Sequence, residues 1–447
     1  MKIGVHLVHL RPGRIGGAEQ YVRNLIEFAV RKRSNCEMYL FLHPDNTSTF
    51  REENGKLRKI VVRTDRDLHS QLHHWIRVLE LDIWFCPLAV VEPYAAIPTV
   101  VTIHDIQHEI YPRFFSPAEL QSRNRYLRMS ARYADAILTV SQYSKKTLIE
   151  QYGLPDDRIH AVHSDADRVF QARPDEPMNR LVKAKYRLPE RYGLYPANFW
   201  PHKNHLNLLR ALVVLRDRDK RTVSMVFTGD WQLSAEAKEY IQEIKHYIQA
   251  HGLGAQIYFT GYVPQEEVPY LYRNAEFLAF PSLFEGFGIP LVEAMKSRLP
   301  IVCSNAASLP EVAGDSALLF DPEDPFDIAA KLVEVQDPST RERLIRSGER
   351  RAADFSWDNT TEVTFHVFDS LLSGGIDMRI ARKLQMIFQL EGYEFVTELY
   401  REFLNREPDP GGLQDHVNLL ASGMPKINIV LGIMMSQEAQ SLYSRGY

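Results

Sequence analysis

Two glutamates next to two glycines form the most specific chemical feature of the 447-residue sequence. Glu285 and Glu293 lie in the segment Phe280–Met295, where an apolar strand, a glycine-containing loop and the start of a helix follow one another. Gly286 and Gly288 let the backbone approach a ligand closely, and amides at a helix start can hold an anion. The segment therefore predicts a ligand contacted at two places, with a tight turn carrying two solvated glutamates as the structural alternative.

Three further features have residue types that suit such a ligand, although none is specific by itself. Lys203 follows Tyr192–Tyr195, the first strand of a second series of strands and helices, where a lysine can neutralise a diphosphate as a compact point charge. His104 ends the apolar strand Thr99–Ile103, and Gly16 and Gly17 form a turn after the first strand. A surface charge, a structural histidine and a plain turn are the alternatives. The dinucleotide fingerprint GxGxxG is absent after that strand, which argues against a simple nicotinamide-dependent enzyme.

Short apolar runs alternating with amphipathic segments predict the elements that must position these residues. Near-continuous apolar strands separated by helices are typical of a parallel sheet covered on both faces. Helices are expected at Ser116–Tyr133 and at Gln142–Tyr152, the latter with Ser141 as its N-cap. Two α/β domains facing each other are therefore predicted, with ligands outside the carboxyl ends of the strands. The predicted strands are Ile3–Val8, Met38–Leu42, Lys59–Val62, Ile83–Cys86, Thr99–Ile103, Ala136–Val140 and Ile159–Val162, then Tyr192–Tyr195, Val223–Phe227, Ile257–Phe259, Phe277–Phe280, Ile301–Cys303 and Ala317–Phe320.

Three domains are predicted, at residues 1–178, 179–374 and 375–447. The stretch Gln171–Pro189 is rich in proline and charge and lacks a strand, which favours a linker between the first two. After Ile376 only helical segments follow, at Phe395–Leu404, Gly412–Ala421 and Lys426–Met435. The third domain is therefore expected to be a small all-helical module.

Composition excludes several classes of protein. A net charge of −4, with 45% apolar and 25% charged residues, is typical of globular domains and not of a collagen, a coiled coil or a dedicated nucleic-acid binder. Cys36, Cys86 and Cys303 form no CxxC pair, so a disulfide framework or cysteine-rich zinc site is not expected, and a reducing cytosol is the expected compartment. Neither a signal peptide nor a membrane-spanning apolar stretch is recognised.

The segment around Glu285 resembles the donor-binding motif of retaining glycosyltransferase family 4, which has the GT-B fold of two Rossmann-like domains with a central cleft. In that family the motif is two glutamates separated by seven residues, here Glu285 and Glu293. The resemblance extends over about residues 1–370. It implies that Glu285 and the amides of Phe287 and Gly288 hold the hydroxyls of the transferred sugar, and that Glu293 binds the nucleotide ribose.

The same resemblance implies roles for residues elsewhere in the chain. Lys203 would bind the donor diphosphate, Gly16 and Gly17 would close over it from the opposite domain, and His104 would contact the transferring sugar. Many members carry an arginine six positions before the lysine, where this chain has Ala197, so Lys203 is expected to rely on help from backbone amides. The other residues assigned to the donor site are Gly286, Leu291 and Val263, the last lying where the family reads the base through backbone atoms.

The resemblance implies retaining transfer of a hexose from a nucleotide diphosphate sugar to a growing glycan in bacterial surface polysaccharide biosynthesis. The expected donor is GDP-mannose, with UDP-glucose second, and the predicted catalytic residues are His104 and Glu285. No cofactor and no metal is expected besides the donor. The alternatives are a GT-B epimerase or phosphorylase and a non-catalytic GT-B scaffold that assembles partners through the helical tail.

The expected partners are the nucleotide sugar donor and a glycan or lipid-linked glycan acceptor, and not nucleic acid. The C-terminal segment resembles a helical domain similar to phycobilisome linker modules, which suggests an assembly partner or glycan contact. The expected location is the cytoplasm. Arg125, Arg128 and Arg132 share one helical face, which is either solvated or docks on anionic lipid at the inner face of the membrane.

Overall fold

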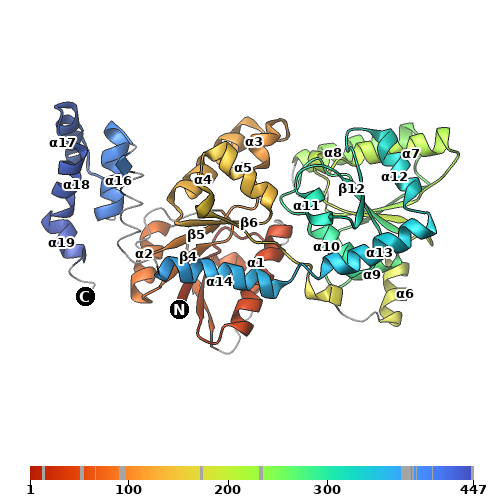
Figure 1. Cartoon of the computed structure of the whole chain (residues 1–447), viewed down its shortest axis with the longest axis horizontal. Helices are drawn as coiled ribbons and strands as arrows, with labels where there is room; N and C mark the ends of the chain where they lie inside the picture. Colours follow the sequence, from red (N-terminus) through yellow and green to blue (C-terminus); the bar gives the residue numbers. More distant parts are fainter. Residues whose placement is uncertain are drawn as a thin grey trace.

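The computed structural model describes residues 1–12, 16–50, 55–65, 67–89, 97–171, 175–230, 235–373, 384, 387–388, 390–404 and 406–443. Two α/β domains lie side by side, and a group of helices lies beside the first domain at the far end of the molecule (Figure 1). The α/β class and the two-domain architecture predicted from the alternation of strands and helices are confirmed.

The first domain is a parallel sheet covered by helices on both faces. Within the described residues, seven strands run in the order β3-β2-β1-β4-β5-β6-β7. Apolar side chains pack on both sides of this sheet, as expected for a parallel sheet buried on both faces. Its strands are β1 (Lys2–His6), β2 (Glu37–Leu42), β3 (Leu57–Val61), β4 (Ile83–Cys86), β5 (Thr99–Thr102), β6 (Ala136–Thr139) and β7 (Ile159–Ala161), and its helices are α1 (Gly17–Lys32), α2 (Leu68–Val78), α3 (Gln107–Ile110), α4 (Pro117–Tyr133) and α5 (Gln142–Tyr152).

The second domain repeats this plan. In the part of the chain that the structure describes, its sheet has six parallel strands in the order β10-β9-β8-β11-β12-β13. The strands are β8 (Gly193–Pro196), β9 (Met225–Thr228), β10 (Ile257–Gly261), β11 (Phe277–Phe280), β12 (Ile301–Ser304) and β13 (Ala317–Phe320). The helices are α6 (Glu176–Lys185), α7 (His205–Arg218), α8 (Ala235–Ala250), α9 (Val268–Asn274), α10 (Ile289–Lys296), α11 (Leu309–Ala313), α12 (Pro325–Glu334) and α13 (Pro338–Ala352).

Local capping explains where two helices of the first domain begin. Ser116 caps α4 in a capping box with Glu119, because each side chain accepts a hydrogen bond from the other residue's backbone. Ser141 caps α5 by accepting from the amide of Ser144, and α5 ends at Gly153, whose φ of 63° lies in the left-handed region. Helix α5 therefore begins at the predicted residue, and α4 begins one residue after its predicted start, with Ser116 as its cap.

The segments between the domains differ from the expectation. The stretch Gln171–Pro189, interpreted as a linker, contains the helix α6, which packs against α9 of the second domain. The predicted boundary between 178 and 179 falls within this helix. A further helix, α14 (Trp357–Ser373), returns to the first domain and packs on α1, as Figure 1 shows. The second predicted boundary, between 374 and 375, lies outside the described residues.

The C-terminal region is helical, as predicted, with α16 (Gly392–Leu404), α17 (Pro410–Ala421), α18 (Lys426–Met434) and α19 (Gln437–Tyr443). These helices share an apolar core of their own, separate from those of the α/β domains. The Tyr133 hydroxyl at the end of α4 donates a hydrogen bond to the carboxylate of Glu398 on α16, which joins the region to the first domain.

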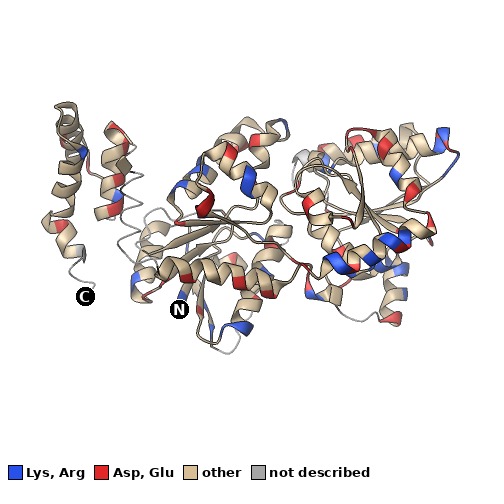
Figure 2. Cartoon of the chain, viewed as in Figure 1, with Lys and Arg blue, Asp and Glu red and all other residues tan. Residues whose placement is uncertain are grey.

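No helix among the described residues is long and apolar enough to cross a membrane. Acidic and basic residues are interspersed along the helices of both α/β domains in the view of Figure 2. In the cationic face predicted on α4, Arg128 forms an ion pair with Glu109 at 2.6 Å, and Arg132 lies over the Tyr133 ring. Part of that face is therefore engaged within the protein.

Candidate functional site

The two loops that carry Lys203 and Glu285 leave the second sheet at its topological switch point. β8 and β11 are neighbours at the position where the strand order reverses. The 3₁₀ turn η5 (Pro201–Lys203) follows β8, and the loop 281–288 follows β11. Ligands of open α/β sheets bind at such a point, outside the carboxyl ends of the strands. The topology therefore places both predicted residues where a ligand is expected.

Lys203 and Glu285 form an ion pair. The Lys203 Nζ lies 2.6 Å from Glu285 Oε1, and the two side chains are 17% and 13% exposed. The ammonium group also lies 5.8 Å from the centre of the Phe280 ring, a cation–π contact. A charged pair that is partly withdrawn from water interacts more strongly than a surface pair. The site thus combines one cation and one carboxylate outside the carboxyl ends of β8 and β11.

The loop that carries Glu285 is held by hydrogen bonds to its backbone. Ser308 Oγ lies 2.9 Å from the carbonyl oxygens of both Glu285 and Phe287. Gly288 adopts φ +100°, a conformation that favours glycine, and a Cβ there would lie 2.7 Å from a methyl carbon of Leu309. These contacts fix the loop just before α10 begins.

Glu293, one turn into α10, is buried and lies between the two domains. Its Oε2 accepts a hydrogen bond from the Tyr272 hydroxyl at 2.6 Å, and its Oε1 accepts from Gln20 Nε2 of the first domain at 3.5 Å. Burial raises the pKa of Glu293 to about 7, although the hydrogen bonds from Tyr272 and Gln20 act in the opposite direction. Sequence patterns gave no signal for Gln20 or Tyr272, which reach Glu293 only through tertiary packing.

His104 follows β5 and faces the Glu285 loop. A Cβ on Gly286 would lie 2.9 Å from the His104 carbonyl oxygen, so the two backbones meet at this point. The His104 Nε2 lies 3.2 Å from the Pro87 carbonyl oxygen, which only accepts hydrogen bonds, so Nε2 carries the proton. Burial lowers the pKa of His104 below its usual value. A neutral imidazole is therefore favoured, with Nδ1 as its acceptor atom.

Gly16 and Gly17 lie at the start of α1, and a Cβ on Gly17 would lie 3.3 Å from Ile289 at the start of α10. The first-domain turn is thus adjacent to the helix that carries Glu293.

Leu291 is fully buried and its amide donates to the Gly288 carbonyl, so neither its side chain nor its amide is available to a ligand. Val263 is also buried.

A sequence of the DxD type, Asp165-Ala166-Asp167, follows β7, so the expectation of a metal-independent site does not rest on the absence of such a sequence. Lys296 Nζ lies 2.5 Å from Asp165 Oδ1. The Asp167 carboxylate accepts hydrogen bonds from the Val169 amide and from Asn24 Nδ2. Within the described residues, no group of three or more His, Cys, Asp or Glu side chains is arranged to hold a metal ion. These aspartates therefore fix the segment between the domains.

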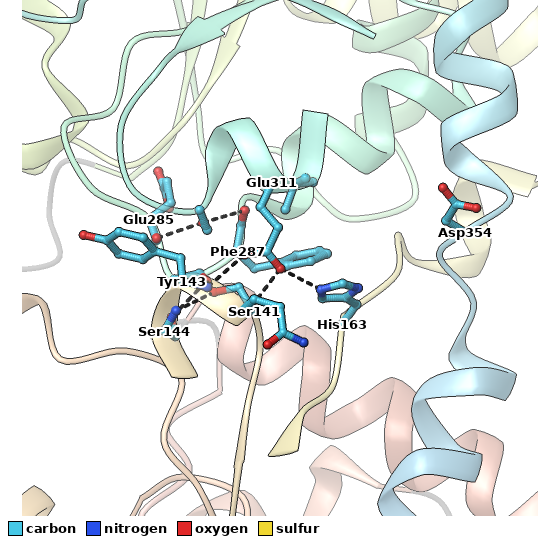
Figure 3. A network of polar contacts seen from close by, with 12 residues as sticks. Ser141, Tyr143, Ser144, His163, Glu285, Phe287, Glu311 and Asp354 are labelled. Carbon is cyan, nitrogen blue, oxygen red and sulfur yellow. Dashed lines mark hydrogen bonds and ion pairs between the residues drawn. The ribbon is translucent and has the colours of Figure 1, made fainter. Parts of the chain in front are cut away.

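A network of polar contacts joins the domains next to the Glu285 loop, as Figure 3 shows. Ser141 and Ser144 on the first domain donate to the Gly286 carbonyl. Glu311 on the second domain accepts from the start of α5 and from His163. The sequence indicates Ser141 as a helix cap, but nothing in it shows that the start of α5 meets Glu311.

Two family models match the α/β domains. The model described as "Glycosyltransferase Family 4" matches residues 15–164, and "Glycosyl transferases group 1" matches residues 182–351. A domain of unknown function (DUF4214) matches residues 388–443. The matches cover both domains that contribute to the site.

Curated relatives and solved structures agree with these models. The chain is 33% identical over 284 residues to O-antigen chain mannosyltransferase B of Escherichia coli, covering 62% of this chain and 72% of that protein. It is 30% identical to the serotype-specific mannosyltransferase WbdA of Escherichia coli, of which it covers 35%. The structure of Anabaena Alr3699/HepE in complex with UDP-glucose superposes with a TM-score of 0.67 at 19% identity, over 83% of this chain and all of that one. The chain therefore belongs to glycosyltransferase family 4 and has the GT-B fold.

Proposed function

We propose that this glycosyltransferase transfers mannose from GDP-mannose to a growing glycan of a surface polysaccharide, with retention of configuration. The similarity to O-antigen mannosyltransferases supports mannose as the sugar. The observation that carries the proposal is the position of Lys203 and Glu285 at the switch point of the second sheet. A cation suits the donor diphosphate and a carboxylate suits the hydroxyls of the sugar beside it.

In this proposal different residues bind different parts of the donor. Lys203 and the amide of Ile289, the first residue of α10, stabilise the diphosphate as negative charge develops on it. Glu285 and the amides of Phe287 and Gly288 hold the sugar hydroxyls, and Glu293 binds the ribose. The acceptor atom Nδ1 of neutral His104 takes a hydrogen bond from a sugar hydroxyl.

The transfer step uses no cofactor or metal. The bond between the anomeric carbon and the phosphate oxygen breaks, and the acceptor oxygen attacks from the same face through an oxocarbenium-like transition state. The acceptor proton goes to an oxygen of the departing diphosphate, so no protein base is required. Closure of the two domains excludes water and aligns the donor with the acceptor.

A panel of nucleotide sugars tests the proposal. The full-length protein is incubated with GDP-mannose, UDP-glucose and related donors, and thermal shift and donor hydrolysis are measured. We expect the largest stabilisation and the fastest hydrolysis with GDP-mannose, because a ligand that binds only the folded state stabilises it. A response to UDP-glucose alone would identify a glucosyltransferase. A protein that binds no donor would be a non-catalytic scaffold.

A further inference from the structure

The N-terminus of α5 is hydrogen-bonded to the second domain at the loop that carries Glu285. Ser141 Oγ donates to the Gly286 carbonyl oxygen at 2.7 Å, and Ser144 Oγ reaches the same oxygen at 3.2 Å. Both serines are fully buried. Since Gly286 directly follows Glu285, hydroxyls of the first domain fix the backbone of a loop that belongs to the second.

Glu311 makes the reciprocal contact from the second domain. Its carboxylate accepts hydrogen bonds from the amides of Gln142 at 2.8 Å and Tyr143 at 2.9 Å. These are the first residues of α5, whose amides have no acceptor within the helix, and the positive end of the helix favours a carboxylate. His163 Nε2 adds a third contact at 2.8 Å. Figure 3 shows the Glu311 side chain pointing toward His163 and the start of α5.

The backbone around Glu311 is itself held firmly. Arg351 of α13 donates to the carbonyl oxygens of Glu311 at 2.6 Å and Val312 at 3.0 Å. At the other end of α11, Ser308 binds the carbonyl oxygens of Glu285 and Phe287. The short helix α11 therefore joins the carboxylate that caps α5 to the loop that carries Glu285.

The Glu311 carboxylate is suited to remain ionised in this position. Its side chain is 21% exposed. Burial raises the pKa of Glu311, but the hydrogen bonds from His163 and from the amides of Gln142 and Tyr143 outweigh burial and leave the pKa below its ordinary value. The charged form is therefore the one that the first domain binds.

We propose that Glu311 is a positioning residue, which caps α5 across the domain interface and so keeps Ser141 and Ser144 on the Gly286 carbonyl. We call this arrangement of Ser141, Ser144, Gly286 and Glu311 the α5 clamp. It sets the closed arrangement in which Gly286 lies against the His104 backbone. Glu311 acts through the Glu285 loop and does not touch the reacting atoms. The inference rests on the proposed function for its effect on catalysis, but not for its effect on domain closure.

Two variants of the full-length protein test the clamp from opposite sides. Glu311→Gln removes the charge with little change in shape, and a Ser141→Ala/Ser144→Ala double variant removes both hydroxyls. Glu150→Gln, on α5 and 53% exposed, is the matched control. Donor hydrolysis gives kcat and KM, small-angle X-ray scattering gives the maximum dimension, and thermal unfolding verifies that each variant is folded.

We expect Glu311→Gln to lower kcat by about tenfold while KM for the donor changes by less than about threefold, because misplacing a loop affects the reaction more than ground-state binding. The maximum dimension should increase as the domains separate. The Ser141→Ala/Ser144→Ala variant should show the same changes in kcat and maximum dimension. A variant that combines the serine changes with Glu311→Gln should show less than the sum of the separate effects, because both remove contacts of the same interface. The control should match the wild type.

The inference is overturned if Glu311→Gln keeps the kcat and the scattering profile of the wild type, or if the two changes add fully. If the wild-type protein hydrolyses no donor, the proposed function fails, yet scattering still decides the clamp. A larger maximum dimension in the Glu311→Gln variant and in the serine variant would support the α5 clamp. A maximum dimension equal to that of the wild type would exclude the clamp.

Discussion

Lys203 and Glu285 neutralise each other, so a diphosphate that binds Lys203 must compete with the Glu285 carboxylate for the ammonium group. We predict that Glu285→Gln binds GDP about three- to tenfold more tightly than the wild type, because the competing charge is gone. The same variant should lose most sugar transfer. Isothermal titration calorimetry measures the first effect and donor hydrolysis the second.

Lys203→Ala is the companion to this variant and should weaken GDP binding. If Glu285→Gln binds GDP more weakly than the wild type, the two side chains do not compete, and the carboxylate contributes directly to holding the nucleotide. That result would contradict the assignment of Glu285 to the sugar.

Glu293 makes the stability of the protein depend on pH. Burial raises its pKa to about 7 from the ordinary 4.5. Between these values the folded state binds a proton that the unfolded chain has released, so the contribution of Glu293 to stability falls as pH rises through this window. We predict that Glu293→Gln gains stability relative to the wild type from pH 5 to pH 8, by up to about 3 kcal/mol.

Chemical denaturation of both proteins at several pH values measures this difference. A Glu→Gln change at the exposed Glu150 is the control and should show no such trend. A constant difference between wild type and Glu293→Gln from pH 5 to pH 8 would contradict the raised pKa.

At the scale of elements, the loop between β11 and α10 meets the loop after β5 with no room for a side chain. A Cβ on Gly286 would lie 2.9 Å from the His104 carbonyl oxygen and 3.0 Å from Asp105 Oδ2. We predict that Gly286→Ala pushes the two loops apart and lowers donor turnover by about tenfold or more. Thermal stability should change little, because each sheet keeps its own core.

Gly254→Ala is the matched control, since a Cβ there meets no atom within 4 Å and its φ is not positive. Steady-state kinetics of the two variants provide the test. Full activity in Gly286→Ala would mean that the loops separate during turnover and that their contact is not needed.

At the scale of the whole molecule, the C-terminal helices form a separate unit on the first domain. They have their own apolar core, and Tyr133 and Glu398 connect them to α4. We predict that truncation after Ser373 leaves donor hydrolysis within about twofold of the wild type, because independent domains retain their function when separated. Loss of hydrolysis in a truncated protein that still unfolds cooperatively would show that the helices contribute to the site.

The sequence by itself determined the strands of both sheets and the family motif. Runs such as Ile83–Cys86 and Phe277–Phe280 are strands with the predicted bounds, because continuous burial within a strand is a local pattern of apolar residues. Glu285 and Glu293 likewise lie in one loop and in the helix that directly follows it. Their spacing is therefore also a local pattern. The helix α6 was missed because proline and charge also suit the first turn and exposed face of a helix.

Only the tertiary structure decided which loops meet. Gln20 lies 273 positions from Glu293, and Ser141 lies 145 positions from Gly286, so no local pattern relates them. The buried state of Leu291 and the pKa of Glu293 likewise depend on neighbours supplied by other elements. Hydrogen bonds and desolvation act over a few ångströms of space, and the distance between two loops is set by how the two sheets pack against each other.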